Sequence, residues 1–99
     1  MMWRHGDVLI AATDAIPAKA KQRLAPILAR GEITGHSHRV EDAATAELWE
    51  SGGVLFLKVV AENARVIHEE HRPITLPRGI YRVWLQREYT PQSIRQVMD

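Results

Sequence analysis

The chain has 99 residues, of which 45% are hydrophobic and 25% charged, and its 13 basic and 12 acidic side chains leave a formal charge of +1. This length predicts one domain over residues 1–99, and the small net charge argues against a nucleic-acid partner. The chain has no cysteine, which excludes disulfides and fits a reducing compartment. No apolar run approaches the roughly 20 residues that a membrane span needs, so we expect a cytoplasmic protein without membrane contact.

The first third of the chain predicts one buried strand and one ambiguous segment. Residues 7–12 form a short apolar run typical of such a strand. Residues 18–25 favour a short helix or an irregular crossing, because their composition suits a helix while Pro17 and Pro26 limit its length. Residues 32–34, which lie between two glycines, suit another strand.

The middle of the chain carries a hairpin pattern. Residues 48–50 and the mostly apolar residues 54–60 flank the turn residues 51–53, which are Ser-Gly-Gly. A second turn is expected at residues 61–63, followed by a strand over residues 65–68.

The last third predicts a turn, a strand and a short helix. Residues 77–79, Pro-Arg-Gly, punctuate the chain, and residues 81–86 then alternate as a half-buried strand does. Thr90 is placed to cap a helix over residues 91–98. Six to eight short strands separated by turns predict a mainly β fold, either a small barrel or a jelly-roll-like sandwich.

Four of the five histidines lie in two short motifs. In Gly35-His36-Ser37-His38, the histidines are two residues apart and therefore share one face of an extended backbone, where both imidazoles could bind one ion. Glu41 could add a carboxylate. Imidazole ligands suit zinc, iron, copper, nickel or manganese, so the sequence predicts a divalent transition metal as cofactor without choosing among these.

The second motif is His68-Glu69-Glu70-His71. Residues three apart face opposite sides of a regular strand, so either one histidine faces the site or a bulge brings both to it. Glu70 and Glu41 are the candidate catalytic residues, as metal ligands or general bases. The alternative is that these four histidines are solvated surface residues. His5 lies near the chain end and is expected to be free in either case.

The first motif, with Glu41 after it, resembles the His-x-His and Glu pattern of cupins, and residues 77–79 resemble their Pro-x-Gly element. Cupins are small β-barrels that often hold one divalent metal on three histidines and a glutamate. The histidine expected after Pro-x-Gly is absent here, so the resemblance implies that His68 or His71 completes the site. The chain also resembles small bacterial and phage proteins that carry Gly-His-x-His and Leu-Pro-x-Gly-x-Tyr, a likeness that implies no function.

The sequence therefore favours a metal-binding small β-barrel with a mononuclear histidine-rich site formed by His36, His38, His68 and His71. Such a site would suit a metalloenzyme acting on a small polar molecule, with oxidoreductase and hydrolase chemistry both open. The alternative is a non-enzymatic β assembly module whose histidines are structural or exposed. A homodimer is expected in either case, because a small β domain without disulfides has strand edges to cover.

Overall fold

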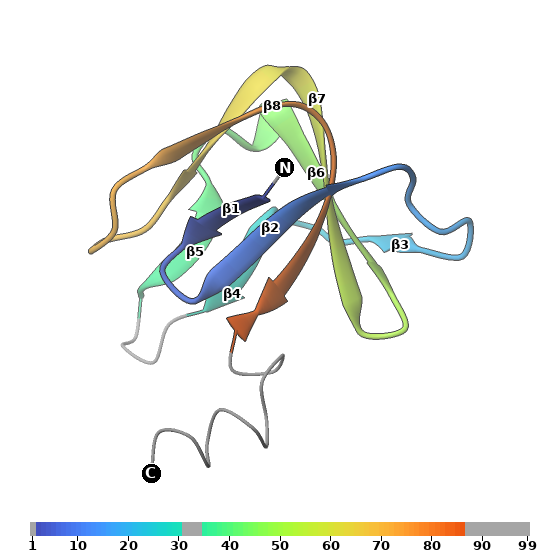
Figure 1. Ribbon diagram of the computed structural model, residues 1–99, viewed down its shortest axis with the longest axis horizontal. Coiled ribbons are helices and arrows are strands. Elements are labelled where there is room, and N and C mark those ends of the chain that lie inside the picture. The colour runs from blue at the N-terminus through green and yellow to red at the C-terminus, as the bar shows by residue number, and fades with distance from the viewer. Residues whose placement is uncertain (1, 31–34, 87–99) are drawn as a thin grey trace, which may run out of the picture.

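The computed structural model describes residues 2–30 and 35–86, and they form a mainly β protein, as the sequence predicts (Figure 1). All strand pairings are antiparallel and belong to one sheet. The elements are β1 (Met2–His5), β2 (Val8–Thr13), β3 (Lys21–Gln22), β4 (Ile27–Arg30), β5 (Ser37–Val40), the 3-10 helix η1 (Ala43–Thr45), β6 (Ala46–Ser51), β7 (Val54–Ile67) and β8 (Ile74–Leu85).

The main path of the sheet runs in the order β1-β2-β8-β7-β5-β4. Strand β6 also pairs with β7, and β3 pairs with β6 at the margin. Within the described part of the chain, β1 and β4 at the two ends of this path are not paired with each other. The sheet is therefore open in these residues, and closure into a barrel or a jelly roll is not confirmed.

The long strands β7 and β8 bend together, and Figure 1 shows them arching over the top of the molecule. Their register shifts between the pair Val59–Gly79 and the pair Asn63–Pro77. The first half of β7 pairs with β6 and its last residues pair with β5, so one strand serves two parts of the sheet. The turns expected at residues 61–63 and 77–79 are wrong, because both segments continue their strands; Pro77 lies beside the shift, where the ladder is already interrupted.

The strands predicted at residues 7–12, 48–50, 54–60 and 81–86 are confirmed, with small shifts in their bounds. Strands β6 and β7 join through Gly52 and Gly53, which have φ angles of +57° and +82°, as a tight two-residue hairpin turn requires. In β8, Tyr81 and Val83 are buried whereas Arg82 between them is exposed, so the predicted alternation holds.

Of the two alternatives expected for residues 18–25, the short helix is wrong, and an irregular crossing describes the segment apart from one short strand. The segment instead contains β3, in which Lys21 pairs with Glu50 and Gln22 with Trp49 of β6. Pro17 and Pro26 leave too few residues for stable helical turns, so the short segment uses the margin of the sheet for its backbone hydrogen bonds. The strand predicted at residues 32–34 and the helix predicted at 91–98 lie outside the described residues.

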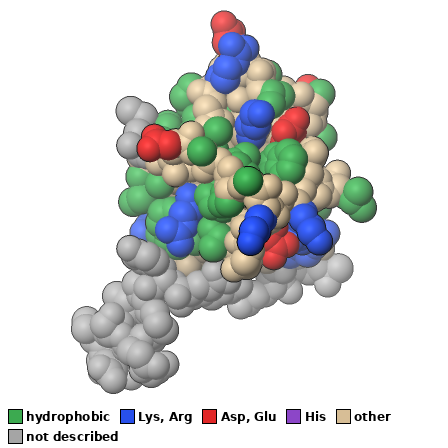
Figure 2. Space-filling view, turned by 90° about the vertical axis from the view of Figure 1, so that its right-hand side faces the viewer, with side chains coloured by type: hydrophobic (Ala, Val, Ile, Leu, Met, Phe, Trp, Pro, Cys, Tyr) green, Lys and Arg blue, Asp and Glu red, His purple; other side chains and the backbone are tan. Residues whose placement is uncertain are grey.

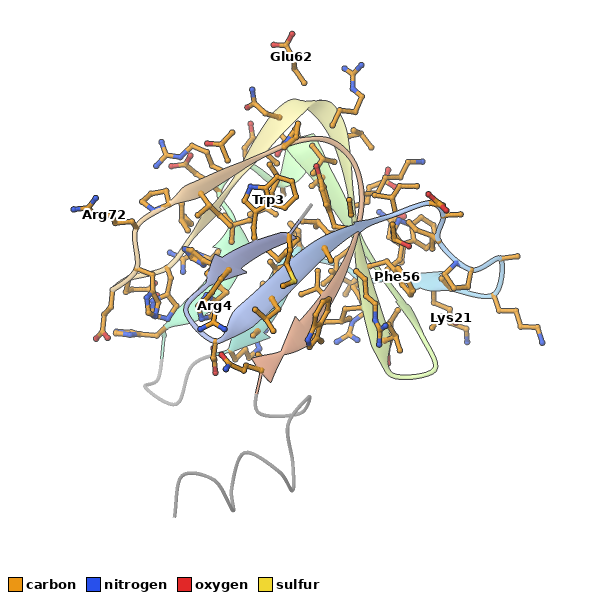
Figure 3. The ribbon with its side chains drawn as sticks, viewed as in Figure 1. Trp3, Arg4, Lys21, Phe56, Glu62 and Arg72 are labelled. Carbon is orange, nitrogen blue, oxygen red and sulfur yellow. The ribbon has the colours of Figure 1, made fainter. Side chains whose placement is uncertain are left out.

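The apolar core is formed by side chains from β2, β4, β5, β6, β7 and β8. Its most deeply buried side chains are Val8, Ile10, Leu57, Val59, Val66 and Leu76. Trp3, labelled in Figure 3, packs against this core. Its ring meets that of Tyr81 edge to face, with centroids 5.4 Å apart. None of the helical segments in the described residues has the length and hydrophobicity needed to cross a membrane.

Candidate metal centre

All five histidines gather where three parts of the sheet meet. His5 ends β1, His36 and His38 lie at the start of β5, and His68 and His71 lie in the connection from β7 to β8. These segments lie together on the left of Figure 1. Figure 2 looks at the molecule from the opposite, right-hand side, and no described histidine is visible on that face.

The register between β5 and β7 explains why the two histidine motifs meet. The strands pair antiparallel, with Val40 opposite Val66 and Arg39 opposite Ile67. Because β7 ends at Ile67, the next pairs of this register lie just outside the ladder. Continued in steps of one residue, the register places His38 opposite His68, Ser37 opposite Glu69 and His36 opposite Glu70.

Contacts between the motifs follow this extended register. The backbone N–H of Ser37 donates to Oε1 of Glu69 at 3.1 Å, and Nδ1 of His36 lies 3.7 Å from Oε2 of Glu70. Oε2 of Glu69 also lies 2.9 Å from the guanidinium of Arg39. Desolvation opposes ionisation of Glu69, but the backbone N–H groups of Glu69 and Ser37, together with Arg39, lower its pKa.

Three histidines come close enough to share an ion. One ring nitrogen from each of His38, His68 and His71 lies within 4.8 Å of the other two. The ring centroid of His38 is 4.4 Å from that of His68 and 5.4 Å from that of His71. A regular strand would present only one of His68 and His71, but the chain bends at residues 69–71 and brings both rings to the same place.

A second group consists of His36, His68 and Glu69. It is the weaker candidate, because the carboxylate of Glu69 already accepts from Ser37 and pairs with the cation of Arg39. His36 and His38 thus fall into different groups that share His68. The sequence predicts that they converge on one ion, whereas the structure places His36 beside Glu70 and His38 beside His71.

His5 is a member of the cluster that sequence reasoning missed. The residue is only 2% exposed, so the expectation of a free histidine near the chain end is wrong. Its Nδ1 lies 2.9 Å from Nδ1 of His38, and its Nε2 lies 2.9 Å from the carbonyl oxygen of Arg72. The signal that could have found it is the turn pair Gly6-Asp7, which folds β1 onto β2 as a hairpin and fixes the chain end.

The backbone of Gly6 lies directly against two of the rings. Its φ angle is +65°, and a Cβ atom there would lie 2.8 Å from Nε2 of His71 and 2.9 Å from Cε1 of His38. A side chain at position 6 would therefore have to displace these rings. Both the left-handed backbone and the space that the imidazoles occupy favour glycine there.

Burial keeps the inner histidines neutral. Desolvation, followed by the nearby His68 and His5, lowers the pKa of His38 from 6.5 to about 4, although Asp7 opposes the shift. Desolvation also lowers the pKa of His5, against the effect of its hydrogen bond to Arg72. At neutral pH both rings are therefore uncharged, which is the form in which imidazole binds a metal.

The two candidate catalytic carboxylates lie in different places. Glu70 is exposed, and its carboxylate is next to His36. Glu41 follows β5 and lies 3.5 Å from Nε of Arg65, with which it forms an ion pair. Of the two, Glu70 is the one whose carboxylate the structure places beside a histidine.

These features define the class of protein: a mainly β protein with a cluster of histidines at the meeting point of three strand ends. The chain belongs to the family described as Domain of unknown function (DUF8820), which it matches over residues 4–86. The matched region contains all five histidines. Comparisons with curated proteins and with solved structures found no match.

Proposed function

We propose that the protein binds one divalent transition-metal ion per chain through ring nitrogens of His38, His68 and His71. The observation that carries this proposal is the approach of three ligand nitrogens to within 4.8 Å of one another. Nitrogens bound to one tetrahedral zinc ion lie about 3.3 Å apart, given Zn–N bonds of about 2.0–2.1 Å. A modest rotation of the exposed His71 and the half-buried His68 would close that difference.

The surroundings of the three rings support an ion with an open coordination position. His38 is 4% exposed and anchors the group from inside, while His71 lies at the surface. Three nitrogen ligands with a fourth position left to water or substrate are typical of catalytic rather than structural sites. A bound ion would supply Lewis acidity or an activated water.

This arrangement suits a metal-dependent enzyme that acts on a small polar molecule. Glu70 is the candidate general base, because its carboxylate lies at the edge of the cluster and is accessible. Glu41 is not needed for the proposal, since it pairs with Arg65. The site is formed by strand ends and a connection, so the proposal requires neither a closed barrel nor a cupin relationship.

A second candidate function is a non-enzymatic assembly module in which the histidines are structural. The hydrogen bond between His5 and His38 and the stacking of His38 on His71 favour it, because such contacts stabilise a cluster without an ion. The two functions differ in one measurable property, the presence of a tightly bound metal.

The test is elemental analysis of the purified protein without an affinity tag, before and after reconstitution with zinc, iron, copper, nickel or manganese. We expect about one equivalent of one metal per chain and a thermal unfolding temperature that rises when the ion is restored. Metal that stays far below one equivalent after reconstitution, with no change in unfolding temperature, would refute metal binding and leave the structural module.

A further inference from the structure

We propose that His5 is a positioning residue that holds His38 in the tautomer with its proton on Nδ1, leaving Nε2 of His38 as the nitrogen with a free lone pair. For its consequence in metal binding, this inference rests on the function proposed above. The tautomer itself is a property of the metal-free protein and can be measured separately.

The direction of the hydrogen bonds follows from the one partner that cannot donate. The backbone carbonyl of Arg72 only accepts, so Nε2 of His5, at 2.9 Å, carries the proton. A neutral imidazole has a single N–H group, so Nδ1 of His5 is an acceptor. Its neighbour at 2.9 Å, Nδ1 of His38, must then be the donor.

The opposite tautomer of His38 is disfavoured by geometry. With the proton on Nε2, the two Nδ1 atoms would face each other at 2.9 Å as lone pairs, and both buried acceptors would be unsatisfied. The proton on Nε2 would gain little in return, because Oδ1 of Asp7 lies 3.7 Å away, beyond normal hydrogen-bond distance.

Burial supports the neutral state that this argument requires. His5 and His38 are 2% and 4% exposed, and desolvation disfavours the charged imidazolium. One proton on each ring also satisfies the observed geometry, with Nε2 of His5 donating to the carbonyl of Arg72 and Nδ1 of His38 donating to His5.

The anchor of this hydrogen-bond chain lies in the same connection as the other two ligands. Arg72 directly follows His71, and Figure 3 shows its side chain pointing away from the molecule, so it is the backbone that faces His5. The end of β1 is thus tied both to β5 and to the β7–β8 connection. Fixing a ligand ring through the N–H opposite to the metal is a general feature of histidine metal sites.

The experiment compares the wild-type protein with His5→Phe, which keeps a ring but removes both hydrogen bonds, and with His5→Asn, whose Oδ1 can still accept from Nδ1 of His38. ¹⁵N NMR of the ring nitrogens reports the tautomer of His38 in metal-free protein. We expect the Nδ1–H form in wild type and in His5→Asn, and a shift toward the Nε2–H form in His5→Phe. Thermal unfolding confirms that each variant is folded. If His5→Phe does not fold, the comparison is made between the wild-type protein and His5→Asn.

Affinity for zinc, measured with the three proteins by competition with a chelator, tests the consequence. We expect a loss of roughly 10–100-fold in His5→Phe, as for other residues that orient a ligand, and a smaller loss in His5→Asn. A proton on Nε2 of His38 in wild type would overturn the inference whether or not metal binds. The Nδ1–H form in a protein that binds no metal would confirm the tautomer and refute the proposed function instead.

Discussion

His38 lies opposite His68 in the continued register of β5 and β7, and the centroids of their rings are 4.4 Å apart. Each histidine belongs to a different motif, 30 residues apart in the sequence. The pairing arises because the buried pair Val40–Val66 fixes the register only two residues away. The contact that defines the candidate site is therefore set by the core.

Replacing His38 by Ala should abolish most metal binding, whereas His36→Ala should reduce it little. His38 belongs to the favoured group of three rings, and His36 belongs only to the group that contains the already paired Glu69. Loss of a direct ligand should cost at least the ~10–100-fold typical of a supporting partner. Titration of both variants with zinc in a calorimeter checks this, and equal effects of the two substitutions would contradict the assignment.

Gly6→Ala should destabilise the protein and disturb the histidines, because its Cβ would lie 2.8 Å from Nε2 of His71. The matched control is Gly52→Ala, since Gly52 has a similar φ angle of +57° but no atom within 4 Å of the place that a Cβ would take. Both variants should lose about 1–2 kcal/mol from the left-handed backbone alone, and Gly6→Ala should lose more. Chemical denaturation gives the two values, and equal losses would show that the space at Gly6 is not constrained.

Acid should destabilise the metal-free protein between pH 7 and pH 4. The folded-state pKa of His38 is about 4, below the ordinary 6.5, and that of His5 is also lowered. The contribution of these two histidines to the free energy of unfolding is complete above pH 6.5. It declines below that pH because the histidines of the unfolded chain take up protons before those of the folded protein. We expect a loss on the order of 1–3 kcal/mol, smaller in His38→Gln. Unfolding temperatures that stay constant from pH 7 to pH 5 would contradict the conclusion that these rings are buried in their uncharged form.

The protein should form a homodimer. Among residues 2–30 and 35–86, β1 pairs only with β2 and lies at one end of the sheet path. Its Met2 is 59% exposed, so an open backbone edge in these residues coincides with an exposed apolar side chain. Light scattering should give twice the chain mass of 11.2 kDa. A replacement of the exposed Arg4 by Pro in β1 should shift the mass toward one chain, and a wild-type mass of one chain at tens of micromolar would remove the prediction.

Local patterns in the sequence were sufficient where neighbouring residues decide the structure. The Gly52-Gly53 turn and the alternation of β8 are of this kind, because turn geometry and side-chain period depend on adjacent residues. The segment around Lys21 was misassigned because its pairing with Glu50 of β6 overrode helix propensity. The continuation of β7 through residues 61–63 likewise depends on its distant partner β8.

The candidate site was predicted in its residue types more than in its geometry. The histidine motifs are visible in the sequence, but their spacing says nothing about the β5–β7 register that opposes His38 to His68. The prediction that His36 and His38 bind one ion considered the geometry of their own strand and not its pairing with β7. His5 was missed because its place near the chain end concealed a hairpin that buries it.

The pair Val40–Val66 lies close to the histidines, and this has a consequence for the order of folding and metal binding. A slip of one residue between β5 and β7 would turn the valines out of the core, so the apolar interior selects the alignment that also brings the rings together. Binding of the proposed ion should therefore follow folding rather than drive it. We expect the metal-free protein to keep a native β spectrum, unlike small zinc modules that unfold without their ion.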